Sequence, residues 1–404
     1  MSTPRSLRLH VGIFGRRNVG KSSLANALAG QAVALVSDVP GATADPVEKP
    51  LELRPLGPVL LVDTAGLDDE GALGALRLAA TRKVFGRVDL AVVAGRAGAW
   101  GAFEDALVDE FRRRGTPVVA VLNQSDLAPE APEPDGLRGR ATAVVRACAR
   151  AGAEDVEELR SALAAAAPGD WMENPPLVRD LLPAGAHVLL VAPIDSGAPR
   201  GRLILPQVRT LRDALDAGAI ATICRDAEAP AALERLGRPP DLTIADSQAF
   251  GRVAKALPPD APLTGFSVLF ARAHGDLEVM AAGAEAVGRL VPGDRVLIAE
   301  SCAHHAGPDD IGRVKIPAIL QAAAGGMLVI EHARGRAFPD DLGVYALVVH
   351  CGGCMTNRGE ILERVERCRA AGVAITNYGL VLARAHGILA RALLPFGGNG
   401  PAHS

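Results

Sequence analysis

The feature that most constrains this chain is the segment Gly15 to Ser22, which has the pattern Gly-x4-Gly-Lys-Ser. It follows a short apolar run, Leu9 to Phe14, and opens a stretch with helical periodicity, Lys21 to Leu28. A glycine-bearing loop between a strand and a helix lets backbone N–H groups close around phosphate oxygens, and the positive end of the helix dipole faces the same phosphates. The segment therefore predicts a strand–loop–helix unit of an α/β fold, with a nucleotide phosphate at the loop.

The chemistry of a magnesium nucleotide suits further residues near this loop. We expect Lys21 to pair with the β- and γ-phosphates, and the Ser22 hydroxyl to ligate Mg²⁺. Thr43 lies on the following loop, where it could close onto the metal when a triphosphate is bound. Asp63 and Gly66 come at the end of the next apolar strand. There the carboxylate can hold Mg²⁺ through water, and the Gly66 N–H can meet the γ-phosphate.

A later strand is followed by Asn123-Gln124-Ser125-Asp126. A carboxylate at this place can accept two hydrogen bonds from the N1 and N2 edge of guanine, which adenine cannot supply. The order of these four elements, and their positions at strand ends, resemble the translation-factor class of small GTPases, and the Era/MnmE-like branch above all. The resemblance covers residues 9–165 and implies binding of GTP and GDP with Mg²⁺ and hydrolysis of GTP.

By this resemblance, Lys21, Thr43, Asp63 and Gly66 serve catalysis, and Cys148-Ala149 stand for the Ser-Ala element beside the base. The residues that the resemblance assigns to the nucleotide are Gly15, Asn18, Val19, Gly20, Lys21, Ser22, Ser23, Asn123, Asp126, Cys148 and Ala149.

Three positions modify this expectation. Gln124 replaces a lysine whose stem packs over the base, which predicts weaker nucleotide binding. Leu67 stands where Ras-like enzymes carry a catalytic glutamine, so hydrolysis should be slow. Asn18 matches an asparagine that binds K⁺ in the Era/MnmE-like branch, although it could also be an ordinary loop residue. We therefore expect slow, K⁺-stimulated conversion of GTP to GDP and phosphate.

A second group of residues lies far downstream, in Cys302-Ala303-His304 and His350-Cys351-Gly352-Gly353-Cys354. The predicted strand Arg295 to Ala299 leads to Cys302, and the predicted strand Tyr345 to Val349 leads to Cys351. Ligands collect at the carboxyl ends of parallel strands, so both segments could deliver thiolates to one point. The pattern predicts a metal site, and a structural zinc held by three cysteines and one histidine is an alternative.

The pattern Cys-x-His, then 45 residues, then His-Cys-x-x-Cys resembles the cluster motif of the [FeFe]-hydrogenase maturation GTPases. Further similarity lies in Asp309 to Pro317, Ala192 to Asp195 and Gly201 to Gln207. The resemblance implies a [4Fe-4S] cluster on Cys302, Cys351 and Cys354, with His304 or His350 as a possible fourth ligand. It also implies a transient diiron subcluster precursor as cargo, a dimerising middle section, and apo-[FeFe]-hydrogenase and radical-SAM maturases as partners.

The 404 residues, 49% of them hydrophobic and 22% charged, have globular composition and are enough for several domains. Alternating strands and helices predict parallel sheets throughout. We expect a P-loop GTPase domain over residues 1–170, a small α/β dimerisation domain over 171–264, and an α/β cluster-binding domain over 265–404. Ser267 to Phe270 is predicted as the first strand of the third section.

Other function classes are disfavoured by composition. The net charge is −3 and no basic block stands out, so nucleic acid is not an expected partner. Apolar stretches are interrupted before they could span a bilayer, and Met1 to His10 has no apolar signal core. We expect a cytoplasmic protein without a membrane partner. Six cysteines in a chain of this length do not make a disulfide framework.

Together these features favour a homodimeric GTP-hydrolysing scaffold that assembles the diiron precursor and delivers it to apo-[FeFe]-hydrogenase, with the GTPase as a timer. One alternative is a ribosome- or tRNA-associated GTPase with a structural zinc. Another is a non-enzymatic metal scaffold with a degenerate GTPase domain, which the replacement of lysine by Gln124 would suit.

Overall fold

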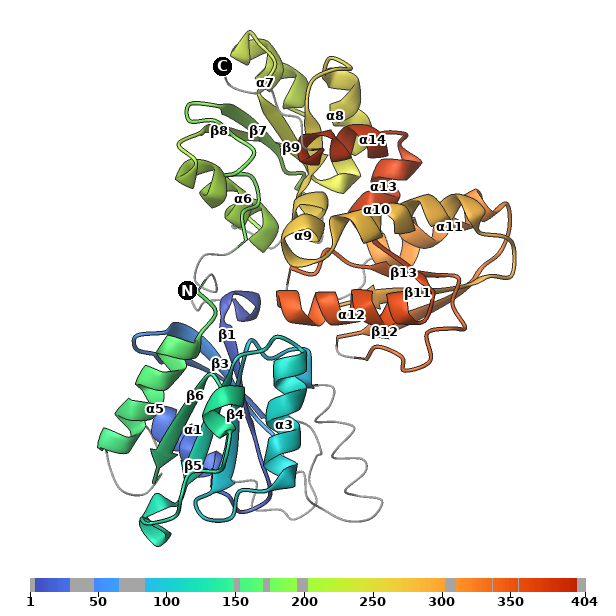
Figure 1. Cartoon of the computed structure of the whole chain (residues 1–404). Helices are drawn as coiled ribbons and strands as arrows, with labels where there is room; N and C mark the ends of the chain where they lie inside the picture. Colours follow the sequence, from blue (N-terminus) through green and yellow to red (C-terminus); the bar gives the residue numbers. More distant parts are fainter. Residues whose placement is uncertain are drawn as a thin grey trace. The chain divides into compact units, whose positions relative to one another are not determined.

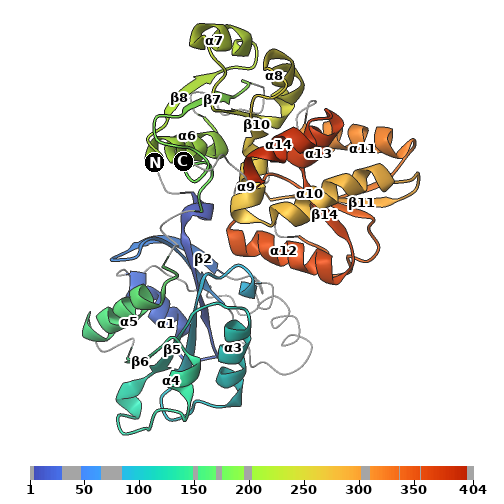
Figure 2. The same ribbon diagram turned by 45° about the horizontal axis from the view of Figure 1, so that its top comes forward.

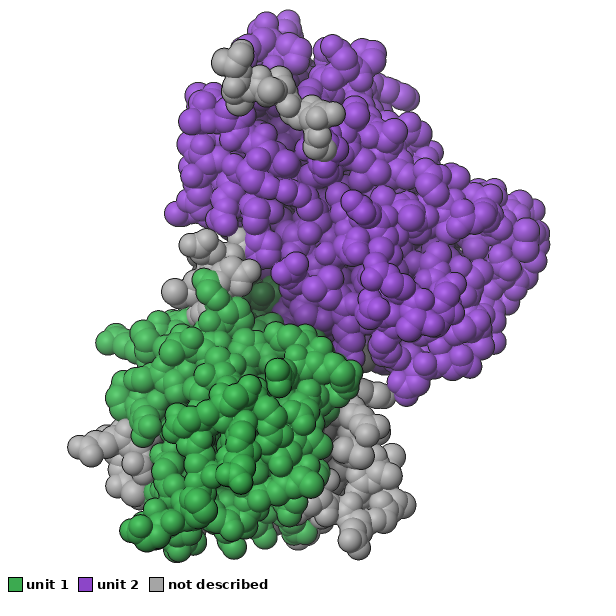
Figure 3. Space-filling model, viewed as in Figure 1, with its two compact units in different colours: residues 1–174 green, residues 175–404 purple. Residues whose placement is uncertain are grey.

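The structure is a computed structural model of the whole chain, which forms two compact units, Met1–Asn174 and Pro175–Ser404 (Figure 3). The residues that the structure describes are 4–29, 47–64, 84–148, 153–169, 175–194, 203–301, 310–335, 337–354 and 356–397.

The first unit is built on a six-stranded sheet with the order β2-β3-β1-β4-β5-β6. Its strands are β1 (Leu9–Phe14), β2 (Val47–Leu53), β3 (Gly57–Asp63), β4 (Leu90–Arg96), β5 (Val118–Asn123) and β6 (Ala143–Ala147). The described helices of this unit are α1 (Lys21–Ala29), α3 (Ala102–Arg113), α4 (Leu137–Arg140) and α5 (Ala153–Ala166), with short 3-10 turns η1 (Arg5–Leu7) and η2 (Ser125–Leu127).

Both faces of this sheet are buried, as the continuous apolar strands predicted. Side chains alternate across a strand, so Val119 and Val121 pack in one core with α1 and α5. Their neighbours Ala120 and Leu122 pack in a second core with α3. In Figure 1, α1 and α5 accordingly lie on one side of the sheet and α3 on the other.

Strand β2 departs from the all-parallel sheet that the sequence predicted, because it pairs with β3 in antiparallel register, Val47 opposite Asp63. It is an edge strand, and its sequence VEKPLEL alternates charges with apolar residues and contains a proline. Proline and charge are tolerated at a sheet edge, where one row of backbone groups has no strand partner. Because of these residues the strand is not an apolar run, and it was not predicted from the sequence.

The second unit contains two four-stranded parallel sheets, with orders β10-β9-β7-β8 and β12-β11-β13-β14. The strands are β7 (His187–Val191), β8 (Ile220–Cys224), β9 (Leu242–Ala245), β10 (Leu263–Gly265), β11 (Arg295–Glu300), β12 (Val329–Arg334), β13 (Leu347–His350) and β14 (Ala374–Asn377). The longer helices are α6 (Leu205–Asp216), α7 (Ala229–Leu236), α8 (Phe250–Ala256), α9 (Phe266–His274), α10 (Leu277–Ala286), α11 (Ile316–Ala324), α12 (Arg358–Ala370), α13 (Tyr378–Ala385) and α14 (Leu389–Leu393). Short helical segments are η3 (Ser247–Ala249), η4 (Val287–Arg289), η5 (Ile311–Lys315) and η6 (Leu394–Phe396).

One continuous core joins the two sheets of this unit. Leu189 and Val191 of β7 belong to the same buried cluster as Leu297 and Val349 of the other sheet. Helices α10 and α12 both pack against β14, which Figure 2 labels. In the β12-β11-β13-β14 sheet, the chain leaves β11 for β12 on one side and then returns to β13 on the other. The carboxyl ends of β11 and β13 therefore form a topological switch point, where ligands of such sheets bind.

The predicted strand Ser267 to Phe270 is wrong, because these residues lie in helix α9. Most residues of α9 are buried, including Phe266, Leu269 and Phe270. Within the predicted segment only Ser267 is not fully buried, so no exposed polar face marks the helical period and the sequence resembles that of a buried strand. Strand β10 pairs with β9, and Phe266, Leu269 and Phe270 of α9 pack in the core of the β10-β9-β7-β8 sheet. The sequence predicted that the third section of the chain begins at residue 265.

Among the described residues, no helix is both long and apolar enough to cross a bilayer.

Candidate functional site

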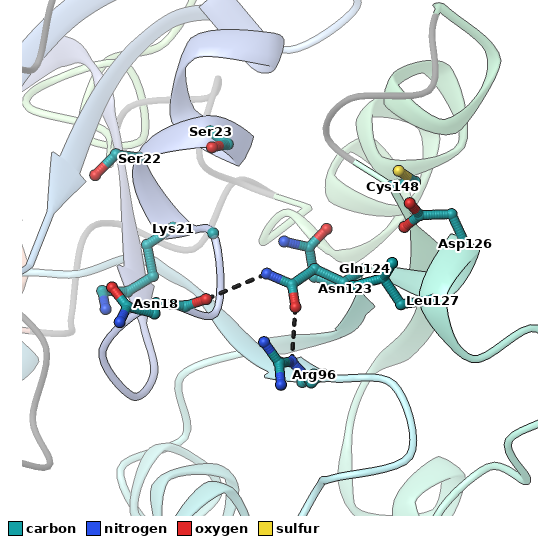
Figure 4. Close-up of a pocket in the computed structure, with 11 residues that line it drawn as sticks. Asn18, Lys21, Ser22, Ser23, Arg96, Asn123, Gln124, Asp126, Leu127 and Cys148 are labelled. Atoms are coloured by element: carbon teal, nitrogen blue, oxygen red, sulfur yellow. Dashed lines mark hydrogen bonds between the residues drawn. The ribbon is translucent and has the colours of Figure 1, made fainter.

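A cavity of about 560 Å³ opens in the first unit at the carboxyl ends of β1, β4, β5 and β6. It is lined by Asn18, Gly20, Lys21, Ser22, Ser23, Arg96, Asn123, Gln124, Asp126, Leu127 and Cys148 (Figure 4). Most residues that the sequence assigned to the nucleotide are thus brought together. Gly15 and Val19 lie in the same loop without lining the cavity, whereas Thr43, Gly66 and Ala149 lie outside the described residues, as does Leu67.

The loop before α1 requires glycine at both ends. Gly15 has φ 147°, and a Cβ there would lie 2.2 Å from the Ala94 carbonyl oxygen. Gly20 has φ 89°, and its Cβ would lie 2.4 Å from Nδ2 of Asn123. Both positions combine a backbone that L-residues rarely adopt with close approach of a neighbour. The loop can therefore follow the wall of the cavity with its backbone, as a phosphate cradle must.

The cation and the hydroxyl of the loop are already oriented. The Lys21 ammonium donates to the carbonyl oxygens of Gly15 and Arg16, at 3.0 and 2.7 Å. Ser22 Oγ donates to Asp63 Oδ2 at 2.9 Å. Burial raises the pKa of Asp63, against the lowering effects of Ser22 and Lys21.

The second carboxylate oxygen, Asp63 Oδ1, is buried and has no hydrogen-bond partner among the described residues. A hydroxyl and a carboxylate are the ligands that Mg²⁺ prefers, so Ser22 and Asp63 fit a magnesium ion held directly or through water.

On the other side of the cavity, Asn123 ties β5 to the phosphate loop. Its side chain is 1% exposed, and Nδ2 donates to the Val19 carbonyl oxygen at 2.7 Å. Asp126 is exposed in the cavity, and Cys148 is buried in its wall. In Figure 4 both residues appear on the side of the view away from Lys21. This placement fits a guanine edge facing Asp126, with Cys148 as a small wall residue.

Gln124 is engaged on both sides. Its Nε2 donates to the Asn18 carbonyl oxygen at 3.2 Å, and its Oε1 accepts from Arg96 Nε at 2.7 Å. Arg96 and Leu127 also line the cavity, and neither was predicted from the sequence. A charged residue directly after the apolar run of β4 was the available signal for Arg96, because it places a cation at the ligand-binding edge of the sheet.

The cysteine segment of the second unit begins at the switch point of its sheet. Strands β11 and β13 are parallel neighbours, with Ala299 opposite His350. The Cys351 N–H donates to the Ala299 carbonyl oxygen at 2.9 Å, and the Ser301 N–H donates to Cys351 Sγ at 3.2 Å. Burial raises the pKa of the Cys351 thiol, whereas His350 and the hydrogen bond from Ser301 lower it. The N–H contact to the sulfur favours the thiolate, the form that binds metals.

His350 is 1% exposed, and both of its ring nitrogens have partners. Arg364 Nη1 lies 2.8 Å from Nε2, and the Cys351 carbonyl oxygen lies 2.7 Å from Nδ1. A guanidinium can only donate, so Nε2 accepts, and Nδ1 carries the proton that it donates to Cys351. Arg364 is itself buried, paired with Glu360 at 2.7 Å and stacked on Phe338 at 5.1 Å.

The remaining thiols differ in setting. Cys354 is half-buried, and its neighbour Gly353 has φ 66°. Cys368 is fully buried on α12, where burial raises its pKa to about 12. Burial also raises the pKa of Cys224 at the end of β8. Cys302 and His304 lie outside the described residues, and among those described no three His, Cys, Asp or Glu side chains are grouped closely enough to hold a metal ion.

The first unit, with its strand–glycine loop–helix and the cavity above the strand ends, is a P-loop GTPase domain. Residues 10–124 match the family model described as 50S ribosome-binding GTPase. Residues 177–275 match the hydrogen maturase F dimerization domain, and residues 278–395 match the hydrogen maturase F tetramerization domain. The chain belongs to the hydrogen maturase F family.

Curated relatives are similar to part of the chain. The tRNA modification GTPase MnmE of Synechococcus sp. (strain JA-2-3B'a(2-13)) is 40% identical over 129 residues, which are 31% of this chain and 27% of that protein. The GTPase Der of Rhizobium etli (strain CIAT 652) is 41% identical over 121 residues, which are 29% of this chain and 25% of that protein. The chain thus spans about a quarter of the length of these relatives.

Solved structures are similar at low scores. The G domain of the T. maritima FeoB iron transporter has a TM-score of 0.31 and 24% identity, over 39% of this chain and 97% of that chain. Era in complex with MgGDPNP and 16S ribosomal RNA nucleotides has a TM-score of 0.33 and 18% identity, over 54% of this chain and 91% of that chain.

Proposed function

We propose that this chain is a GTP-hydrolysing iron–sulfur scaffold that carries the diiron subcluster precursor and delivers it to apo-[FeFe]-hydrogenase. The observation that carries the proposal is the presence, in one chain of the hydrogen maturase F family, of a nucleotide cavity and of a cysteine segment at a sheet switch point. Radical-SAM maturases would supply the precursor. The dimerization and tetramerization domains support self-association of the scaffold, for which we propose a homodimer as the basic form.

In this proposal Cys302, Cys351 and Cys354 hold a [4Fe-4S] cluster. Cys351 fits this role because a backbone N–H donates to its sulfur, the kind of contact that stabilises cluster sulfurs. When bound, the cluster would supply an iron with an exchangeable fourth ligand for the diiron cargo. His304 remains a candidate for that ligand. His350 could take the role only by giving up its contact with Arg364.

The cluster assignment is tested by purifying the chain without air and measuring iron, sulfide and the EPR spectrum of the reduced protein. We expect about four irons and four sulfides per chain for a [4Fe-4S] cluster and a reduced-cluster signal, both strongly reduced in Cys351→Ser. Cys224→Ser is the matched control, because this thiol lies on β8 of the other sheet, and it should retain the signal. Stoichiometric zinc without iron would contradict the proposal and favour a structural zinc site.

For the nucleotide site we propose that Lys21, Ser22 and Asp63 bind the phosphates and Mg²⁺, with Asp126 facing guanine. Thr43 and Gly66 would complete the site when GTP is bound. We also propose that Asn18, exposed in the cavity, helps to bind a K⁺ ion that stimulates slow hydrolysis. GTP turnover should then be faster in KCl than in NaCl at equal ionic strength, and Asn18→Ala should remove the difference. Equal rates of the unaltered chain in both salts would exclude K⁺ stimulation.

The nucleotide would act as a timer, with loops ordered by the γ-phosphate altering contact with the maturases or the hydrogenase. On this view GTP hydrolysis regulates exchange of partners and does not drive the chemistry at the metals. The three domains of this proposal keep the boundaries 1–170, 171–264 and 265–404 as predictions, and the cytoplasm remains the expected compartment.

A further inference from the structure

Two residues of the nucleotide cavity share an unusual backbone conformation. Asn18 has φ 61° and Gln124 has φ 57°, and they are the non-glycine residues with positive φ in the described part of the chain. The two are joined, because Gln124 Nε2 donates to the Asn18 carbonyl oxygen. Strained backbone of this kind persists only where surrounding contacts hold it, and it is concentrated at functional sites. The contacts of Gln124 are thus part of how the cavity is built.

The third member of this arrangement is Arg96. It is the last residue of β4, directly opposite Asn123 in the register with β5, so it stands next to Gln124 at the edge of the sheet. Arg96 Nε donates to Gln124 Oε1 at 2.7 Å, and the two terminal guanidinium nitrogens take no part in this hydrogen bond. Arg96 is exposed, lines the cavity, and forms no ion pair with any residue in the described ranges.

Arg96 lines the same cavity as Lys21, assigned to the phosphates, and Asp126, assigned to the base. In Figure 4 Arg96 lies below Gln124, with Lys21 to the left in this view and Asp126 to the right. A cation without a carboxylate partner, fixed in the wall of a cavity that takes an anionic ligand, is a binding element for that ligand. The planar guanidinium can also lie against a purine face, as an ammonium cannot.

From these contacts we propose that Arg96, oriented by Gln124, is a nucleotide-binding residue that provides the positive charge absent from position 124. The proposal rests on guanine-nucleotide binding in this cavity. Gln124 then has two separate roles: its amide nitrogen fixes the phosphate loop through Asn18, and its amide oxygen positions Arg96. The pair replaces a single lysine by two residues, one at the end of β4 and one directly after β5.

If Gln124 were only a weaker substitute for lysine, Gln124→Lys should strengthen GDP binding. The proposed division of roles predicts a different effect. A lysine has three donors and no acceptor, so Gln124→Lys would remove the acceptor that orients Arg96 and place a second cation beside it. The substitution should therefore weaken GDP binding while Arg96 is present. Once Arg96 is removed, the same substitution should strengthen GDP binding, because the new ammonium is then the cation beside the nucleotide.

The test is a double-mutant cycle on the full chain, with GDP affinity measured by titration calorimetry in the presence of Mg²⁺. We expect Arg96→Ala to weaken GDP binding about tenfold or more, as for loss of one charge-assisted contact. Gln124→Lys alone should weaken binding about threefold or more, and Gln124→Lys in the Arg96→Ala background should restore part of the loss. Arg138→Ala, which removes an exposed arginine of α4 outside the cavity lining, is the matched control and should bind like the unaltered chain.

Three results would overturn the proposal: unchanged affinity in Arg96→Ala, tighter GDP binding by Gln124→Lys in the presence of Arg96, or an equal effect of Gln124→Lys in both backgrounds. The third result is the one expected if the role of Arg96 is purely structural. Thermal unfolding of each variant checks that the fold is retained. Failure of the unaltered chain to bind GDP would contradict the nucleotide site itself, and with it the role of Arg96.

Discussion

The buried histidine of α9 should make the second unit sensitive to acid. His274 is 3% exposed, and Arg209 Nη1 lies 2.8 Å from its Nε2. Burial, and then the positive charge of Arg209, lower the pKa of His274 from 6.5 to about 3. Between these two values the folded state binds fewer protons than the unfolded state, so the free energy of unfolding falls as the pH is lowered below about 6.5.

The size of this effect follows from the pKa difference. Each pH unit below 6.5 costs about 1.4 kcal/mol until the folded pKa is reached, which amounts to about 2 kcal/mol at pH 5. His274→Gln keeps an acceptor for Arg209 and removes the titrating group, so the variant should lose this part of the pH dependence. His187→Gln is the control, because the partner of that histidine is a neutral hydroxyl and not an arginine: Thr222 Oγ1 lies 2.9 Å from Nε2.

Hydrogen exchange followed by mass spectrometry can measure this in the full chain. Protection factors of the α6 and α9 peptides give the free energy of opening at pH 7 and pH 5 without requiring the whole chain to unfold in one step. We expect opening to become easier by about 2 kcal/mol at pH 5 in the unaltered chain and in His187→Gln, and by clearly less in His274→Gln. An identical pH dependence in all three proteins would refute the reasoning.

Two further substitutions test the site geometry. Gly20→Ala should weaken GDP binding about 100-fold or more, because it places a methyl group against the side chain of Asn123 at a positive φ; fluorescence titration with a labelled GDP would measure it, and near-normal affinity would contradict the described loop. Arg364→Met leaves Glu360 unpaired in a largely buried position and should cost about 3–5 kcal/mol in stability, whereas Arg252→Met, which breaks an exposed ion pair, should cost less than about 1 kcal/mol. Thermal unfolding of both variants compares them, and equal effects would count against the buried role of Arg364.

The first unit shows what sequence patterns can predict. Its central strands are buried on both faces and therefore appear as apolar runs, and the phosphate loop is a local motif whose glycines are required by the backbone. Strand β2 was missed because an edge strand can carry charge and proline. Helix α9 was predicted as a strand because most of its residues are buried and no exposed polar face marks the helical period.

Contacts between residues of one site that lie on different elements depend on strand register and helix packing, which a single sequence does not reveal. The identity of Gln124 suggested a weaker nucleotide site, but its partner Arg96 is brought beside it only by the pairing of β4 with β5. The same is true of His350, whose neighbour Arg364 comes from α12. The sequence could name His350 as a possible ligand, while its hydrogen bonds could be known only from the folded chain.

In the proposed function, the cysteine segment and the nucleotide cavity act together in delivering the diiron precursor to apo-[FeFe]-hydrogenase. The direct measurement is hydrogen evolution by apo-[FeFe]-hydrogenase after incubation with chain that has been loaded by the radical-SAM maturases under anaerobic conditions. We predict activation by the unaltered chain and by Cys224→Ser, none by Cys351→Ser, and an altered rate of activation by Lys21→Ala. Activation by Cys351→Ser equal to that of the unaltered chain would contradict the account.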